Sequence, residues 1–228
     1  MNELQDFGFV MPHWAYWGWL AIMPVLLIFF TGGTQSDAAA ATDELAPSTT
    51  PEENKVPPYT GNRFTHAIDW LSNASGIFVA FWTINAVVFY FFEVVMRYVF
   101  NMPTIWVHES SYLLFGMQYL MTGAFALLHG SHVRVDIFYV KLPPRGRVGM
   151  DIFTSVIFFV FALAMVWTSW TFMISSIEMK EVSLETWQIQ YWPVKTVMFV
   201  GSVLILLAGL SKLVNDILLF RQMGEGRV

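Results

Sequence analysis

Five long uncharged stretches constrain what this chain can fold into more than any other feature. They cover residues 7–36, 70–92, 110–128, 152–174 and 196–211. A bilayer core about 30 Å thick needs ~20 helical residues, so all but the last are long enough to cross it alone. The last reaches that length with residues 192–195 before it and 213–220 after it. The sequence therefore predicts an all-α integral membrane protein.

Composition supports a bilayer environment and excludes several classes of function. Hydrophobic residues make up 56 % of the 228 residues and charged residues 13 %, whereas soluble domains carry roughly 25 % charged residues. The net charge of −5, without a basic cluster interleaved with aromatics, argues against nucleic-acid binding. The absence of cysteine excludes disulfides, thiol nucleophiles, thiolate metal sites and thiolate-held iron–sulfur clusters.

The first apolar stretch predicts a helix over about 9–30 that remains in the mature protein. Glu3 and Asp6 precede it and no basic residue does, which is the reverse of a signal-peptide n-region. The chain then becomes rich in Gly, Ala, Ser, Thr, Pro and acidic residues up to about residue 62. Its prolines forbid a continuous helix, so we expect a solvated linker.

Four further helices are expected along the rest of the chain. The first runs over about 64–100, and the second follows Pro103, an allowed first-turn position, and reaches about Leu128. The third covers 152–174, after the helix-breaking pair Pro143 and Pro144. A solvated segment over 175–191 precedes the last helix. Trp187 and Trp192 are able to sit at the headgroup level there.

The basic residues indicate the orientation of these helices. If the helices alternate, one side of the membrane receives only Arg97 and Lys180. The other side receives Lys55, Arg63, Arg134, Lys141, Arg145, Arg147, Arg221 and Arg227. By the positive-inside rule the linker, the middle loop and the C-terminus are cytoplasmic, and the N-terminus is periplasmic.

Ionisable groups inside apolar helices are expensive and mark candidate functional positions. Glu93 with Arg97, and Lys212 with Asp216, are spaced i, i+4 and are expected to form intramembrane ion pairs. Glu109 has no basic residue within a turn. It is either hydrated near the outer surface or bonded to a partner helix, and a proton relay is less favoured because no ladder of ionisable groups accompanies it.

No enzyme motif is present: the chain lacks a phosphate loop, a GxSxG elbow, an HExxH pair and a dinucleotide fingerprint. It also lacks the repeats and broken helices of a stand-alone carrier. The alternative that remains is a haem- or quinone-associated membrane anchor subunit of a respiratory complex, for which His66, His129 and His132 are the candidate ligands. Arg134 and Asp136 either clamp one another or bind a separate subunit.

Two sequence runs resemble a known family. The first is the run 97–101 with Pro103, Trp106 and Glu109, and the second is 129–139, HGSHVRVDIFY. Together with Asp151, Tyr191 and Lys195 they resemble the small membrane subunit (Q-type, DctQ-like) of tripartite ATP-independent periplasmic (TRAP) transporters. The resemblance covers about 64–220.

The resemblance implies a four-helix scaffold subunit in the bacterial inner membrane with no cofactor and no substrate site of its own. Its implied partners are a large M-type membrane subunit, which holds the sodium and substrate sites, and a periplasmic binding protein that delivers organic acids. The candidate subunit-interface or structural residues are Asn101, Pro103, Trp106, Glu109, His132, Arg134 and Asp136.

The first 62 residues have no counterpart in the usual small subunit. We therefore expect four segments: an extra N-terminal transmembrane helix (1–31), a cytoplasmic linker (32–63), the four-helix small-subunit core (64–221) and a cytoplasmic tail (222–228). The segment 175–191 is also longer than in the shortest members. It resembles a subgroup linked to 2-oxo acids and related monocarboxylates.

Overall fold

The computed structural model describes residues 11–31, 63–129 and 142–224. This part of the chain is helical apart from a few residues at the ends of the described ranges and the connections 99–106 and 180–191. The helices are α1 (His13–Thr31), α3 (Arg63–Tyr98), α4 (Val107–Leu128), α6 (Pro144–Met179) and α7 (Trp192–Gly224). Apart from them, residues 182 and 190 form an isolated antiparallel bridge.

Four of these helices are long and apolar enough to cross a membrane. Their candidate spans are Thr65–Tyr98, Val107–Leu128, Arg145–Glu178 and Trp192–Gln222, with mean hydropathies of 1.9, 1.3, 2.1 and 2.2. Each exceeds the ~20 residues that a bilayer core requires. The prediction of an all-α membrane protein is confirmed.

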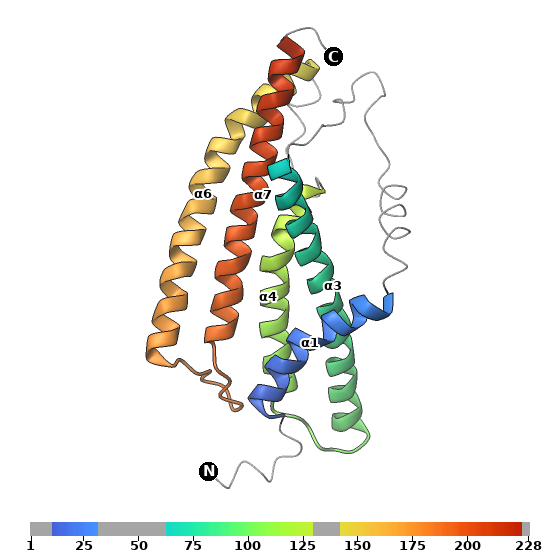
Figure 1. The fold of residues 1–228 in the computed structure, drawn as a ribbon. Helices are drawn as coiled ribbons and strands as arrows, with labels where there is room; N and C mark the ends of the chain where they lie inside the picture. Colours follow the sequence, from blue (N-terminus) through green and yellow to red (C-terminus); the bar gives the residue numbers. More distant parts are fainter. Residues whose placement is uncertain (1–10, 32–62, 130–141, 225–228) are drawn as a thin grey trace.

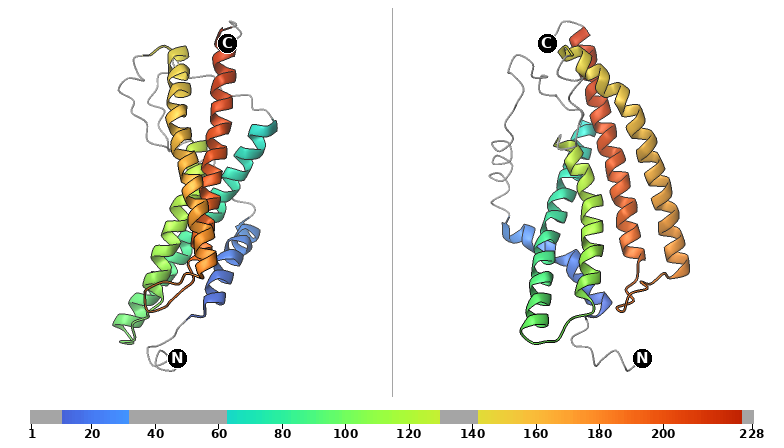
Figure 2. Two further views of the ribbon diagram at one scale, coloured as in Figure 1. Left: turned by 90° about the vertical axis from the view of Figure 1, so that its left-hand side faces the viewer. Right: turned by 180° about the vertical axis from the view of Figure 1, so that it is seen from behind.

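The four long helices pack side by side in the spatial order α3, α4, α7, α6 (Figure 1). Helix α7 therefore lies between α4 and α6, and α6 is the helix directly before α7 in the chain. The segments 99–106 and 180–191 lie at one end of this layer, which we call the loop end. The start of α3, the end of α4, the start of α6 and the end of α7 lie at the other end, which we call the terminal end (Figures 1 and 2).

Helix α1 lies obliquely across one face of α3 and α4 (Figures 1 and 2). It begins at the loop end and finishes part of the way along the longer helices. Its 19 residues extend about 28 Å, because an α-helix rises 1.5 Å per residue. The expected extra helix is present, but it is not among the four candidate spans found in the described residues. That α1 crosses the bilayer stays a prediction.

Two helix boundaries differ from those expected from the sequence. The prediction that a helix opens at Pro103 is wrong: α4 begins at Val107, because the polar groups of Thr104 bond to a side chain of α3 instead of a helical turn. Helix α6 runs from Pro144 to Met179, well beyond the uncharged stretch 152–174. Charged residues at a membrane interface do not interrupt a helix, so an uncharged run underestimates its length.

Small residues let α7 approach its neighbours closely. A Cβ atom on Gly201 would lie 2.9 Å from the carbonyl oxygen of Leu120 in α4, so the two backbones nearly touch. Between α6 and α7 the hydroxyls of Ser169 and Ser202 lie 3.0 Å apart in the buried interface. Close approach and interhelical hydrogen bonds are the main sources of helix association in a bilayer.

Candidate functional site

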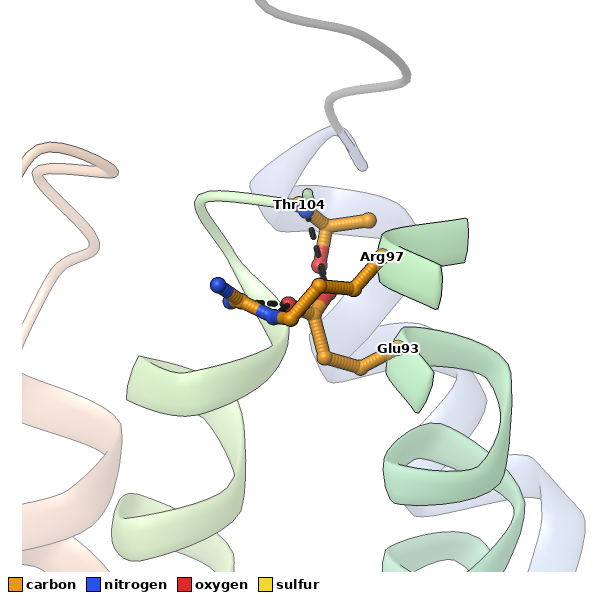
Figure 3. Close-up of polar contacts among 3 residues, drawn as sticks. All are labelled: Glu93, Arg97 and Thr104. Carbon is orange, nitrogen blue, oxygen red and sulfur yellow. Dashed lines mark hydrogen bonds and ion pairs between the residues drawn. The ribbon is translucent and has the colours of Figure 1, made fainter. Parts of the chain in front are cut away.

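A carboxylate at the loop end ties α3 to the segment that follows it. Glu93 accepts hydrogen bonds from Arg97 Nε and from the backbone N–H of Thr104, each at 3.0 Å. The second guanidinium nitrogen of Arg97 and the hydroxyl of Thr104 also contact it (Figure 3). The i, i+4 spacing pointed to Arg97, whereas nothing in the sequence indicated Thr104. Glu93 is therefore a clamp on the α3–α4 connection rather than an unpaired charge.

The same connection contains Asn101 and Pro103, and both side chains are exposed. Asn101 has a positive φ of 54°, a left-handed conformation that asparagine tolerates better than most residues. The N–H of Met102 then donates to the carbonyl of Met96 at 2.9 Å. The geometry gives Asn101 a turn-forming role, and its use in a subunit interface stays a prediction.

Trp106 is the centre of an aromatic cluster at the loop end. It is 2 % exposed, and its ring centroid lies 5.4 Å from Phe89, 6.2 Å from Phe92 and 6.1 Å from Trp187. Trp187 is 4 % exposed and packs inside the chain, and its place at headgroup level stays a prediction. It is buried because the segment 180–191 folds back over Trp106.

Helix α1 closes this cluster through a set of hydrogen bonds that we call the α1 seam. The Tyr16 hydroxyl donates to the Ser110 carbonyl at 2.9 Å, and Tyr16 is fully buried. The other bonds of the seam are Trp82 Nε1 to Leu20 O at 2.9 Å, Trp19 Nε1 to Asn85 Oδ1 at 2.7 Å, and Trp187 Nε1 to Met11 O at 3.0 Å. These long-range bonds attach α1 to α3, to α4 and to the segment 180–191.

Glu109 lies in the first turn of α4 and is 2 % exposed. Neither carboxyl oxygen has a hydrogen-bond partner within the described residues. Burial contradicts the hydrated alternative for this residue. The alternative that Glu109 bonds a partner helix stays a prediction, and for a helix of another chain it requires that the residues covering Glu109 move aside.

The segment 180–191 is held by its own contacts. The N–H of Ser183 donates to the carbonyl of Ile189 at 2.8 Å, and Ile189 is fully buried. Lys195 forms an ion pair with Glu181 at the base of the segment. The Lys195 ammonium, by donating a hydrogen bond to the carboxylate, lowers the pKa of Glu181 below its usual value.

A polar cluster joins three helices toward the terminal end. The Lys212 ammonium lies 3.9 Å from Asp216 and 3.9 Å from Asp151, which comes from α6. The Ser211 hydroxyl donates to Asp69 of α3 at 2.8 Å. The i, i+4 spacing pointed to Asp216 as the partner of Lys212, and only the packing of α6 on α7 shows Asp151. A hollow of about 120 Å³ adjoins Asp69 and Lys212.

Three of the candidate residues, His132, Arg134 and Asp136, lie outside the described residues. Within the described ranges no group of three His, Cys, Asp or Glu side chains is placed to hold a metal ion. His129 Nδ1 lies 3.0 Å from the carbonyl oxygen of Phe125 in its own helix. The polar side chains described above therefore hold helices and their connections together through ion pairs and hydrogen bonds.

Comparison with known families identifies the chain. The family described as "Tripartite ATP-independent periplasmic transporters, DctQ component" matches residues 86–219. The match begins within α3 and ends within α7, so it includes the Glu93 clamp and Glu109, whereas α1 lies outside it. No curated protein matches the chain. Because the match covers more than half of the 228 residues, this protein belongs to the DctQ family, the small membrane component of TRAP transporters.

Proposed function

We propose that this chain is the scaffold subunit of a sodium-coupled TRAP transporter that imports organic acids delivered by a periplasmic binding protein. The family match over residues 86–219 carries the proposal. A component of a tripartite system works with two others, here a large M-type membrane subunit and the binding protein. The family match favours a transporter component over the haem- or quinone-associated anchor.

The packing of the four spans supports a static role. The Glu93 clamp, the Lys212 cluster and the close contact of Gly201 with Leu120 each tie neighbouring helices together. Such contacts favour one arrangement, because close backbone packing leaves few alternatives. In the proposed division of labour this chain supplies a fixed support. The large subunit moves and holds the substrate and the sodium ions.

The proposed orientation follows from the two ends of the layer. The loop end has few basic residues, and the basic residues Arg145, Arg147 and Arg221 lie at the terminal end. We infer that the loop end faces the periplasm and the terminal end faces the cytoplasm. The segment 180–191 is then available to the binding protein. In this proposal the first 31 residues add a helix to the scaffold. The cytoplasmic linker expected over 32–63 lies, apart from Arg63, outside the described residues.

Co-purification and uptake test the proposal together. An affinity-tagged version of this chain, expressed with the large subunit, should retain that subunit through detergent solubilisation. Proteoliposomes with both membrane subunits and the binding protein should take up labelled pyruvate, lactate or succinate only with an inward sodium gradient.

Three outcomes would overturn this function. Equal uptake by proteoliposomes that lack this chain would remove the scaffold role. A Soret band in the purified protein, with no large subunit bound, would restore the redox-anchor alternative. Uptake by this chain alone would make it a carrier.

A further inference from the structure

One face of α4 carries polar side chains in the middle of its span. Tyr112, Gly116 and Tyr119 are spaced i, i+4 and i+7 and are all exposed, so they share one side of the helix. Tyr119 follows Ser110, the acceptor of the α1 seam, by about two and a half turns, which places it on the side of α4 opposite α1. The right-hand view of Figure 2 shows that side of the layer, with α1 behind it. These three residues form what we call the tyrosine face.

The tyrosine face lies deep in the membrane. Helix α4 has 22 residues and is therefore about 33 Å long, little more than the thickness of the hydrocarbon core. Gln118 and Tyr119 fall at its midpoint. Water does not reach this depth, and each polar group without a hydrogen-bond partner there carries a large penalty.

The hydrogen bonds of the face are incomplete. The hydroxyl of Tyr112 lies 3.3 Å from the hydroxyl of Tyr191, so it has a partner. The side chain of Tyr119 is 77 % exposed, and its hydroxyl has no hydrogen bond within the described residues. One hydroxyl of the face therefore lacks a partner near the bilayer midpoint.

The outer face of α6 is built differently. Val156, Val160 and Phe161 are 64 %, 67 % and 61 % exposed and are apolar. Hydroxyls on this helix return to their own backbone, as Thr171 does to the carbonyl of Trp167 at 3.0 Å. A tyrosine cannot make that bond, because its hydroxyl lies too far from its own helix. Lipid chains can cover the apolar face of α6, but they offer no hydrogen-bond partner to the tyrosine face.

The shape of the tyrosine face favours another helix. A Cβ atom on Gly116 would have no other atom within 4 Å, so a notch separates Tyr112 from Tyr119. Small residues at such positions let a second helix approach closely, and polar neighbours hydrogen-bond to it. All these positions lie within the family match 86–219.

We propose that the tyrosine face is the docking surface for a transmembrane helix of the large transporter subunit. That helix passes over Gly116 and accepts a hydrogen bond from the Tyr119 hydroxyl. The inference rests on the proposed function, because the family description makes this chain one component of a larger transporter. Lipid and a second copy of this chain are the other possible occupants, and the experiment separates them.

Photo-crosslinking identifies the occupant. The cross-linker p-benzoylphenylalanine replaces Tyr119 in one variant and Phe161, an apolar exposed residue of α6, in the control. Both variants are expressed with the large subunit and irradiated in membranes. We expect an adduct of this chain with the large subunit from position 119 and none from position 161. Adducts to lipid alone, or to a second copy of this chain, from position 119 would overturn the proposal.

A steric variant gives an independent readout. Gly116→Trp fills the notch, and we expect it to lower the amount of co-purified large subunit about fivefold or more. Val160→Trp on α6 is the matched control and should retain the wild-type amount. Because nothing lies within 4 Å of position 116, the melting temperature of the chain purified alone should not change.

The two proposals fail in different ways. If the wild-type chain binds no large subunit, the proposed function is wrong. If the wild type binds it and Gly116→Trp binds it equally well, only the docking surface is wrong. The chain has no cysteine, so Tyr119→Cys tests self-association directly: a disulfide-linked dimer formed by an oxidant in membranes would assign the face to a second copy.

Discussion

Helix α4 presents two faces that are completed differently. On one face α1 covers the helix: Tyr16 bonds to Ser110, and Trp106 is enclosed by aromatic rings. On the other face Gly116 lies open, and the exposed Tyr119 has no hydrogen bond from its hydroxyl within the described residues. The difference shows that this chain itself covers only one of these two faces of α4. The covered face should govern the stability of the isolated chain, and the open face should govern its assembly.

The covered face should show the largest effect on stability. Trp106→Ala removes a side chain that is 2 % exposed, and a cavity of this kind costs about 3–5 kcal/mol. Trp167→Ala, at a position 76 % exposed on α6, should cost little. Unfolding of the purified chain in mixed micelles measures both. Equal losses would mean that the aromatic cluster does not support the fold.

A second comparison uses the same substitution on the two sides of α4. Gly201→Ala places a methyl group 2.9 Å from the Leu120 carbonyl oxygen and should destabilise the chain by about 1–3 kcal/mol through overpacking. Gly116→Ala enters open space and should leave stability unchanged or raise it slightly, since alanine favours a helix by up to about 1 kcal/mol. Thermal unfolding in detergent measures the stability of both variants. A loss of stability from Gly116→Ala as large as that from Gly201→Ala would contradict the open face.

A third comparison tests paired against unpaired carboxylates. Glu93→Gln keeps only one acceptor oxygen and no charge, so it loses the hydrogen bonds to either Arg97 or Thr104 and should destabilise the chain by about 1–2 kcal/mol. Glu109→Gln removes a buried carboxyl group that has no partner in the described residues, so stability should stay the same or rise. The same unfolding assay measures both variants. Destabilisation by Glu109→Gln would reveal that the carboxylate bonds to a residue outside the described part of the chain.

The smallest effect concerns the segment that brings Trp187 to the covered face. Lys195 lowers the pKa of Glu181, so the pair stabilises the fold above the unfolded-state pKa of about 4.3 and loses this as pH falls through the folded-state value. The expected contribution is below about 1 kcal/mol, since the pair is partly exposed.

Wild type should therefore lose more stability between neutral and acidic pH than Lys195→Met does. Lys180→Met, an exposed lysine beside the same segment, is the control and should titrate like wild type. Melting temperature across the pH series is the measurement. Identical pH profiles for wild type and Lys195→Met would show that the pair does not contribute.

Much of the fold could be predicted from apolar runs, because a span needs only length and low charge. The starts and ends were less accurate where charge was used as the boundary: α6 extends past both ends of 152–174. Local pairs such as Glu93 with Arg97 follow from helix geometry. Thr104 and Asp151 complete their sites from other elements, and no local spacing indicates a contact of that kind.

The burial of Trp187 and Tyr16 shows the limit of residue type as a guide. Tryptophan and tyrosine near the end of a span usually mark the membrane interface. Here both enter the core, because the segment 180–191 and α1 fold over the same part of α4. Whether an aromatic residue faces lipid headgroups or protein depends on what packs above it.

The amino-acid sequence by itself determined that this protein spans a membrane with helices and which family it belongs to, since both depend on local composition and short motifs. Only the tertiary structure decided that α7 lies between α4 and α6, that α1 crosses α3 and α4, and that α4 keeps one open face. These features depend on contacts between segments far apart in the chain. Such contacts are selected by the fit of whole surfaces, which no local pattern encodes.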